Sequence, residues 1–112
     1  MTDRDRPQIA IDDEFGRPLA GAEIELVNPT GARASLHVVA GHLPIGTRGR
    51  LVDAVLDAPE IRSRQWVQVA LPLGDTEMLN RVHERCVGAV ARAAGVTCLI
   101  DVNVPQQAGA AD

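Results

Sequence analysis

Apolar residues recur at every second position in four separate segments, and this alternation restricts the fold more than any other feature of the chain. In residues 22–27, Ala22, Ile24 and Leu26 point one way while the glutamates between them point the other. Such alternation predicts strands that bury one face and leave the other in solvent. The other alternating segments are residues 34–41, 64–73 and 96–104, and residues 8–12 alternate weakly.

Two further stretches carry apolar residues at helical spacing. The first spans residues 49–58 and ends before Pro59, because proline cannot continue a helix. The second runs from Asp75, a good N-cap residue, to residue 94, where Gly95 suits the C′ position. The apolar stripes are Leu51, Val52, Val55 and Leu56 in the first helix and Leu79, Val82, Cys86, Ala89, Val90 and Ala93 in the second.

The predicted order of elements is (β)ββαβαβ, with residues 8–12 as an additional edge strand. Because most strands alternate instead of being apolar throughout, we expect an α/β (α+β) two-layer sandwich. Its mixed sheet of about four to five strands carries both helices on one face. We expect a single domain over residues 8–104, a flexible N-terminal segment at 1–7 and a flexible tail at 105–112.

One segment has a local resemblance to a known family. The stretch DEFGRPLAGAEIEL, residues 13–26, resembles the opening of carboxypeptidase-regulatory or transthyretin-like β-sandwich repeats, in which D-x-x-G-x-P-L-x-G-A precedes an alternating strand. The resemblance implies an all-β environment for this segment and brings no functional residues with it. The helix predicted from Asp75 departs from an all-β pattern, so the α/β architecture remains the prediction.

Charge and composition argue against several classes of function. The net charge is −4, whereas nucleic-acid-binding domains usually present a basic field, so nucleic acid is not an expected partner. All 11 cationic side chains are arginine, which excludes lysine Schiff-base chemistry and is typical of GC-rich bacterial genomes. One Phe, one Trp and no Tyr leave few aromatic platforms for flat cofactors, and no cofactor is predicted.

The expected compartment is the cytoplasm. The N-terminal MTDRDRPQ has no apolar core of a secretory signal, and no apolar run approaches the length of a membrane span. Two cysteines do not make a disulfide framework in a chain of this size. We therefore expect reduced thiols and no association with a membrane.

The stretch GHLPIGTRGRLVDAVL, residues 41–56, is where an alternating strand becomes the first helix. A helix N-terminus presents free N–H groups and a positive dipole end, so it can bind phosphate or carboxylate. Arg48 and Arg50 place cations in the first turn, against the dipole, which suits a bound anion. The candidate ligand-binding residues are Gly46, Thr47, Arg48, Gly49 and Arg50, with His42 and Asp75 if both helices start at one sheet edge.

The same stretch also has a purely structural interpretation. GTRGR matches neither the phosphate-binding GxxxxGK[ST] nor the dinucleotide-binding GxGxxG motif. In this interpretation Thr47 caps the helix, both arginines are solvated, and the glycines and Pro44 only turn the chain.

The strongest candidate for a metal or thiol site is His83 with Cys86, three residues apart in the second predicted helix. No CxxC or HxxxH pair completes a metal site, and Cys86 and Cys98 both fall on apolar faces. We therefore predict two buried thiols and no metal. Because the sequence shows neither a GxSxG motif nor a Ser/His/Asp set, no catalytic residue is predicted.

These negative findings favour a non-catalytic interaction or regulatory domain. Such a domain would form a homodimer or bind a protein partner through its open sheet face or an edge strand. The alternative is a sensor or enzyme that binds a small anionic ligand at residues 46–50. A phosphate, a nucleotide or an acyl-CoA-like compound would suit that site.

Overall fold

The computed structural model describes residues 7–104, and over this range the chain forms six strands and three helices. The elements are β1 (Gln8–Asp12), β2 (Pro18–Asn28), β3 (Gly31–Val38), α1 (Thr47–Asp57), α2 (Pro59–Arg62), β4 (Trp66–Pro72), α3 (Thr76–Arg85), β5 (Val90–Ala94) and β6 (Thr97–Asn103). None of these three helices is long and apolar enough to cross a membrane. The flexible segments predicted at 1–7 and 105–112 lie outside the described residues, apart from Pro7.

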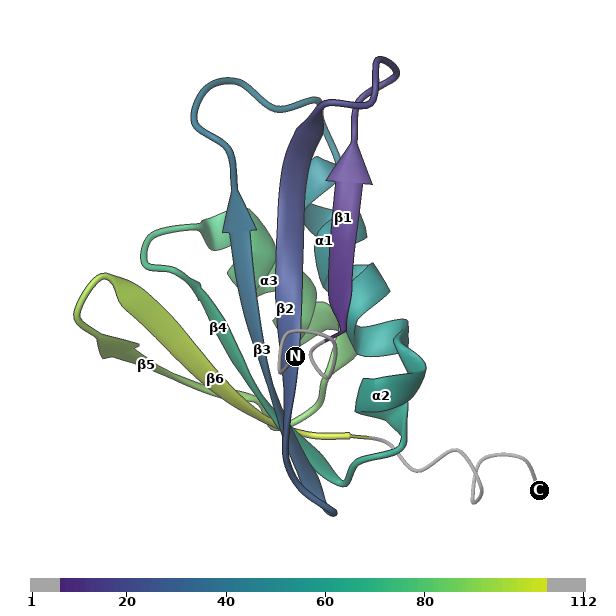
Figure 1. Cartoon of the computed structure of the whole chain (residues 1–112). Helices are drawn as coiled ribbons and strands as arrows, with labels where there is room; N and C mark the ends of the chain where they lie inside the picture. Colours follow the sequence, from purple (N-terminus) through teal and green to yellow (C-terminus); the bar gives the residue numbers. More distant parts are fainter. Residues whose placement is uncertain (1–6, 105–112) are drawn as a thin grey trace.

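The strands form one mixed sheet in the order β1-β2-β3-β4-β6-β5. β3 and β4 run parallel, because α1 and α2 carry the chain back between them, and all other neighbours in the sheet run antiparallel. Figure 1 shows α1 and α3 behind the sheet, on the same face. The predicted α+β architecture, a mixed sheet with helices on one face, is therefore confirmed.

The core lies between the sheet and the helices, on the side that the alternation predicts. Ile24, Val67 and Ile100, from three different strands, are each at most 1% exposed. Each buried aliphatic side chain of this size contributes about 1.5–3 kcal/mol relative to its exposed state, so this layer is the main source of stability. The helices add Leu51, Val52 and Val55 from α1 and Met78 and Val82 from α3.

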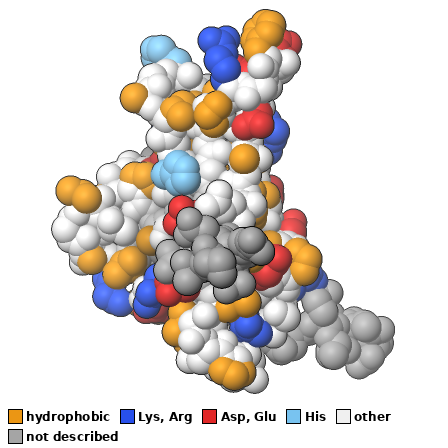
Figure 2. Space-filling model, viewed as in Figure 1, with side chains coloured by type: hydrophobic (Ala, Val, Ile, Leu, Met, Phe, Trp, Pro, Cys, Tyr) orange, Lys and Arg blue, Asp and Glu red, His pale blue; other side chains and the backbone are white. Residues whose placement is uncertain are grey.

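The opposite face of the sheet is open to solvent and carries polar and charged side chains among apolar ones. Glu25, Arg33, Gln68 and Asp101 are register partners on β2, β3, β4 and β6 and form one row across the face. Arg33 donates to Glu25 at 3.4 Å and to Gln68 at 3.3 Å, and Gln68 donates to Asp101 at 3.3 Å. Figure 2 shows charged and apolar side chains scattered over this side instead of one apolar patch.

The helix predicted for residues 75–94 is too long. α3 ends at Arg85, and Val90–Ala94 form the edge strand β5, paired antiparallel with β6. Gly88, at φ +79°, lies in the turn after α3, and Gly95, at φ +65°, opens a two-residue hairpin loop instead of capping a helix. Alanine and arginine favour helix locally, so only the pairing with β6 makes this segment a strand.

Other predictions also need correction. Because β5 replaces part of a helix, the sheet has six strands instead of four to five. Pro59 follows the end of α1, as predicted, but it also begins the short helix α2. Residues 13–26, which resemble β-sandwich repeats, form the turn after β1 and most of β2 in an α+β sheet, so the all-β implication is wrong.

Candidate ligand site where two parallel strands diverge

The sheet opens between β3 and β4 towards their carboxyl ends. The β3–β4 ladder runs from Gly31 opposite Trp66 to Ser35 opposite Ala70 and stops there. β3 continues to pair with β2 as far as Val38, while β4 continues to pair with β6. The two strands therefore follow different neighbours and separate, as Figure 1 shows.

A hollow of about 330 Å³ lies at this opening. Beyond the last pair of this ladder, residues 36–38 of β3 and residues 71–72 of β4 no longer pair with each other, so the edges that these two strands turn towards each other are unpaired. Backbone N–H and C=O groups on such edges are free to bind a ligand. In open α/β sheets the carboxyl ends of diverging strands are the usual place for a ligand. The lining residues are Ser35, Leu36, Ala70, Leu71, Pro72, Val96 and Thr97.

The starts of α1 and α3 lie at the same end of the sheet. Arg48, in the first turn of α1, donates from Nε to Asp75 Oδ2 at 2.9 Å, and the Asp75 side chain is only 7% exposed. The second oxygen of Asp75 accepts from Met78 N and caps α3. Arg48 and Asp75 are thus close together, as expected if both helices start at the same edge of the sheet. The negative charge of Asp75 also compensates the positive charge of Arg48, which opposes the α1 dipole.

Gly46, and not Thr47, occupies the N-cap position of α1. Gly46 adopts φ +91°, and no side chain caps the helix. Thr47 is 1% exposed, and its Oγ1 makes no hydrogen bond within the described residues, so the predicted capping role is wrong. Gly49 has open space where a side chain would stand. The Thr47 N–H already donates to Pro44 O at 3.2 Å, so the N–H groups of Arg48 and Gly49 are the ones in this first turn without a helical partner.

Arg50 faces a surface groove between α1 and α3. The groove is lined by Gly46, Gly49, Arg50, Asp53, Glu77, Asn80, Arg81 and Glu84. Arg50 is exposed and forms no ion pair within residues 7–104, whereas Arg81 is held by Asp53 and Glu84. Arg50 is thus the free cation of this surface.

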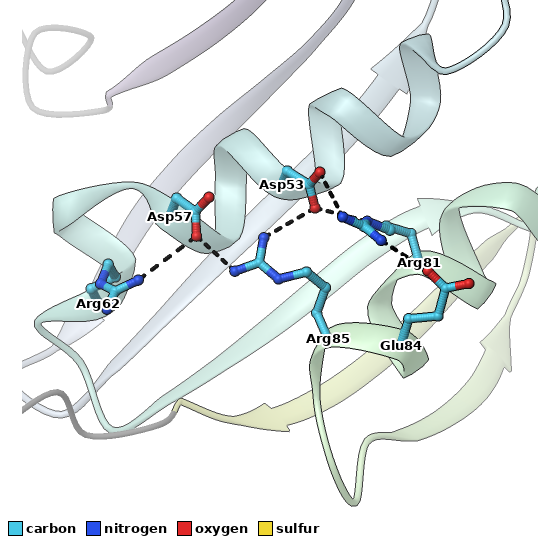
Figure 3. Close-up of polar contacts among 6 residues, drawn as sticks. All are labelled: Asp53, Asp57, Arg62, Arg81, Glu84 and Arg85. Carbon is cyan, nitrogen blue, oxygen red and sulfur yellow. Dashed lines mark hydrogen bonds and ion pairs between the residues drawn. The ribbon is translucent and has the colours of Figure 1, made fainter. Parts of the chain in front are cut away.

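Six side chains form an ion-pair cluster that joins α1 and α2 to α3 (Figure 3). Arg81 donates to both oxygens of Asp53, at 2.8 and 3.0 Å, and Arg85 also reaches Asp53, at 3.0 Å. Hydrogen bonds from Arg81, and secondarily from Arg85, hold the pKa of Asp53 below its ordinary value, although desolvation opposes them. The cluster is completed by Asp57, Arg62 and Glu84.

Replacing Asp53 by asparagine is expected to lower the free energy of unfolding at neutral pH by about 1 kcal/mol, because the carboxylate is partly exposed and solvent screens its pairs. A lowered pKa contributes stability above the unfolded-state pKa, and this contribution is lost as pH falls through the folded-state value. The difference between wild type and D53N should therefore vanish in acid. Urea unfolding between pH 7 and pH 3 measures it, with Glu14→Gln as an exposed control. A pH-independent difference would contradict the assignment.

The remaining predicted site residues do not join the opening. His42 is exposed and lines neither the opening nor the α1–α3 groove. His83 is exposed while Cys86, beyond the end of α3, is buried, so the two do not share a face. Burial raises the pKa of the Cys86 thiol, which keeps it protonated and unreactive. No metal-ligand cluster occurs among the described residues.

The residues that line the opening were missed by the sequence analysis. Ser35 and Ala70 belong to correctly predicted strands, but alternation within each strand does not reveal where two strands part. One signal was present: Pro72 lacks a backbone N–H and so weakens ladder pairing at the end of β4.

Solved structures of N-acetyltransferases share this fold. A ribosomal-protein-alanine N-acetyltransferase from Brucella melitensis matches 93% of this chain and 72% of its own, at TM-score 0.64 and 11% identity. A spermidine N-acetyltransferase from Vibrio cholerae, in complex with CoA and spermine, matches 91% and 68%, at TM-score 0.63 and 13% identity. The Salmonella typhimurium protein yncA, solved with its cofactor acetyl-CoA, matches 80% and 60%, at TM-score 0.58 and 14% identity.

At this level of identity the likeness shows the fold alone, which is GNAT-like. No protein-family model matches the sequence, and no curated protein matches it either. The fold of N-acetyltransferases contradicts the prediction of a non-catalytic interaction domain. Two of the similar structures hold acetyl-CoA or CoA, so the comparisons favour the alternative prediction, a small anionic ligand, over the interaction domain.

Proposed function

We propose that this chain binds acetyl-CoA and transfers its acetyl group to an amine. The observation that carries the proposal is the opening between β3 and β4, next to the uncapped start of α1, in a fold shared with N-acetyltransferases. One of the similar structures holds acetyl-CoA, and another holds CoA with spermine. We place this activity in the bacterial cytoplasm, in keeping with the two free cysteines.

In this proposal the phosphates of CoA lie at the start of α1. The first-turn N–H groups and the positive dipole end attract an anion, and Gly46 and Gly49 leave room for it to approach the backbone. Arg50 adds a free cation beside them. Arg48 acts as a positioning residue, since its pair with Asp75 holds the starts of α1 and α3 together.

The pantetheine arm of CoA fits the opening between the strands. The arm is extended and carries amide groups, which can pair with the unmatched backbone edges of β3 and β4. Ala70, Pro72 and Val96 line the opening and keep exposed apolar surface that can contact its methylene groups. The thioester then lies inside the opening, beside Ser35 and Ala70.

The acetyl group passes directly from the thioester to the amine. Cys86 and Cys98 are buried, so neither is placed to carry the acyl group. The amine nitrogen attacks the thioester carbonyl, a C–N bond forms, and the C–S bond breaks. The amine loses a proton and CoA leaves as the thiol, with backbone N–H groups available to stabilise the carbonyl oxygen.

Titration calorimetry with acetyl-CoA tests the proposal. Arg50→Ala should weaken binding roughly tenfold, equivalent to about 1.4 kcal/mol, because it removes the free cation at the phosphate position. Arg92→Ala, on the exposed edge strand β5, is the matched control and should bind as wild type does. Absence of acetyl-CoA binding by the wild-type protein would refute the proposed function. Equal effects of the two substitutions would refute the role of Arg50.

A further inference from the structure

A shallow groove crosses the open face of the sheet over β1, β2 and β3. Small residues form its floor, chiefly Ala10 and Gly21, and Glu23 and His37 also line it. Ala10 pairs with Gly21, and Gly21 pairs with His37, so these three residues stand in one row across the strands. The groove therefore brings a carboxylate and an imidazole to one place on this face.

Gly21 makes this arrangement possible. A methyl group on Gly21 would lie 3.0 Å from Nε2 of His37 and 3.1 Å from the carbonyl oxygen of Ile9. The imidazole thus occupies the space above β2 that a side chain would otherwise fill. It lies over the sheet within the groove instead of projecting away from it.

The groove adjoins the opening between β3 and β4. Ser35 lines the opening, is the register partner of Glu23 and precedes His37 by two residues on the same face of β3. Neighbouring strands are about 4.8 Å apart, and residues two apart on a strand are about 7 Å apart. Glu23 and His37 therefore stand within side-chain reach of the opening.

The charge of the groove suits a cation. Glu23 is exposed and forms no ion pair within residues 7–104, whereas Glu25, two residues further along the same face, is paired with Arg33. The other groove residues carry no charge: they are Gln8, Ile9, Ala10, Pro18, Ala20, Gly21, Ala22 and Val39. A single unpaired carboxylate over a floor of small residues favours a protonated amine over an anion.

We propose that this groove is the acceptor site and that it takes primary amines that are positively charged at neutral pH. This inference rests on the proposed acetyl transfer. Glu23 binds the ammonium group, and His37 accepts the proton that the amine must lose before its nitrogen attacks the thioester. The C–N bond then forms and the C–S bond breaks. The nitrogen gives up its second proton to the leaving thiolate, so CoA departs as the thiol, while His37 returns the first proton to water.

The first test measures amine binding. Spermidine is titrated into ¹⁵N-labelled protein that is saturated with CoA, and NMR records the amide signals. The amide signals of Gly21, Glu23 and His37 should shift, and Glu23→Gln should abolish these shifts while Glu25→Gln keeps them. Shifts that avoid the groove, or that are equal in the two variants, would overturn the inference. If CoA does not bind, the proposed function fails separately, and spermidine titration of the free protein still decides whether the groove binds amines.

The second test is thiol release from acetyl-CoA in the presence of spermidine. E23Q should raise KM for spermidine about tenfold with little change in kcat. His37→Ala should lower kcat about 100-fold. Added imidazole should restore part of this rate, because the substitution leaves a ring-sized space over Gly21. E25Q and His83→Ala, on the exposed side of α3, are the controls. An unchanged kcat in H37A, or no rescue by imidazole, would rule out the role of His37.

Discussion

Replacing Gly31 by alanine is expected to lower the free energy of unfolding by about 2–3 kcal/mol and to shift Tm down by roughly 10–20 °C. A methyl group at this position would overlap the indole carbons Cζ2 and Cε2 of Trp66, the partner of Gly31 in the β3–β4 ladder. The indole ring of Trp66 covers Gly31 at the end of the β3–β4 pair where the two strands are still hydrogen-bonded. Relief of the overlap requires Trp66 or the strand to move, and thermal unfolding measures the cost.

The reason for this loss can be isolated with a second substitution. In a Trp66→Ala background the same glycine has no indole above it, so G31A should then be neutral or slightly stabilising, since alanine suits a strand better than glycine. As a control, the same change is made at Gly49 on α1, where the added methyl group meets open space. Gly49→Ala should stabilise the fold by about 0.5–1 kcal/mol. If G31A costs the same with and without Trp66, steric overlap is not the cause.

The layered architecture could be predicted from the sequence because alternation is a local property of each strand. Ile24, Val67 and Ile100 lie on the predicted helix-facing side, and the polar residues between such positions lie on the other. The error came at β5, where Val90–Ala94 continue an apparent helical stripe from α3. That segment is a strand only because β6 pairs with it, and pairing with a later segment cannot be inferred from local propensity.

The candidate site was predicted only in part, because part of it depends on contacts that form only in the folded chain. The glycines and arginines before α1 marked a helix start that could bind an anion, and the structure leaves Gly46, Gly49 and Arg50 at an open surface. Asp75 lies beside this helix start, as expected if both helices begin at one sheet edge, but its ion pair with Arg48 was not predicted and leaves that arginine no longer free to bind an anion. The separation of β3 from β4 depends on which neighbour each strand follows, and it appears only in the assembled sheet.

Filling the opening between β3 and β4 is expected to have the largest effect on ligand binding. Ala70 is the last β4 residue paired with β3 and lines the opening, so Ala70→Phe places a ring where the pantetheine arm is proposed to lie. A ligand that cannot enter loses the backbone pairing along the whole arm. We expect acetyl-CoA binding to fall by about 100-fold or more, equivalent to about 2.7 kcal/mol, as measured by calorimetry.

One further substitution that fills the opening, together with two controls, separates obstruction of the site from misfolding. Ser35→Phe approaches the same opening from β3 and should have a similar effect, whereas Ala70→Ser should bind acetyl-CoA nearly as wild type does. Ala91→Phe adds the same ring on the exposed strand β5 and should leave binding unchanged. Circular dichroism and Tm show whether each variant keeps the fold. If folded A70F and S35F bind acetyl-CoA within threefold of wild type, the arm does not occupy the opening, because a ring on either strand would have to block it.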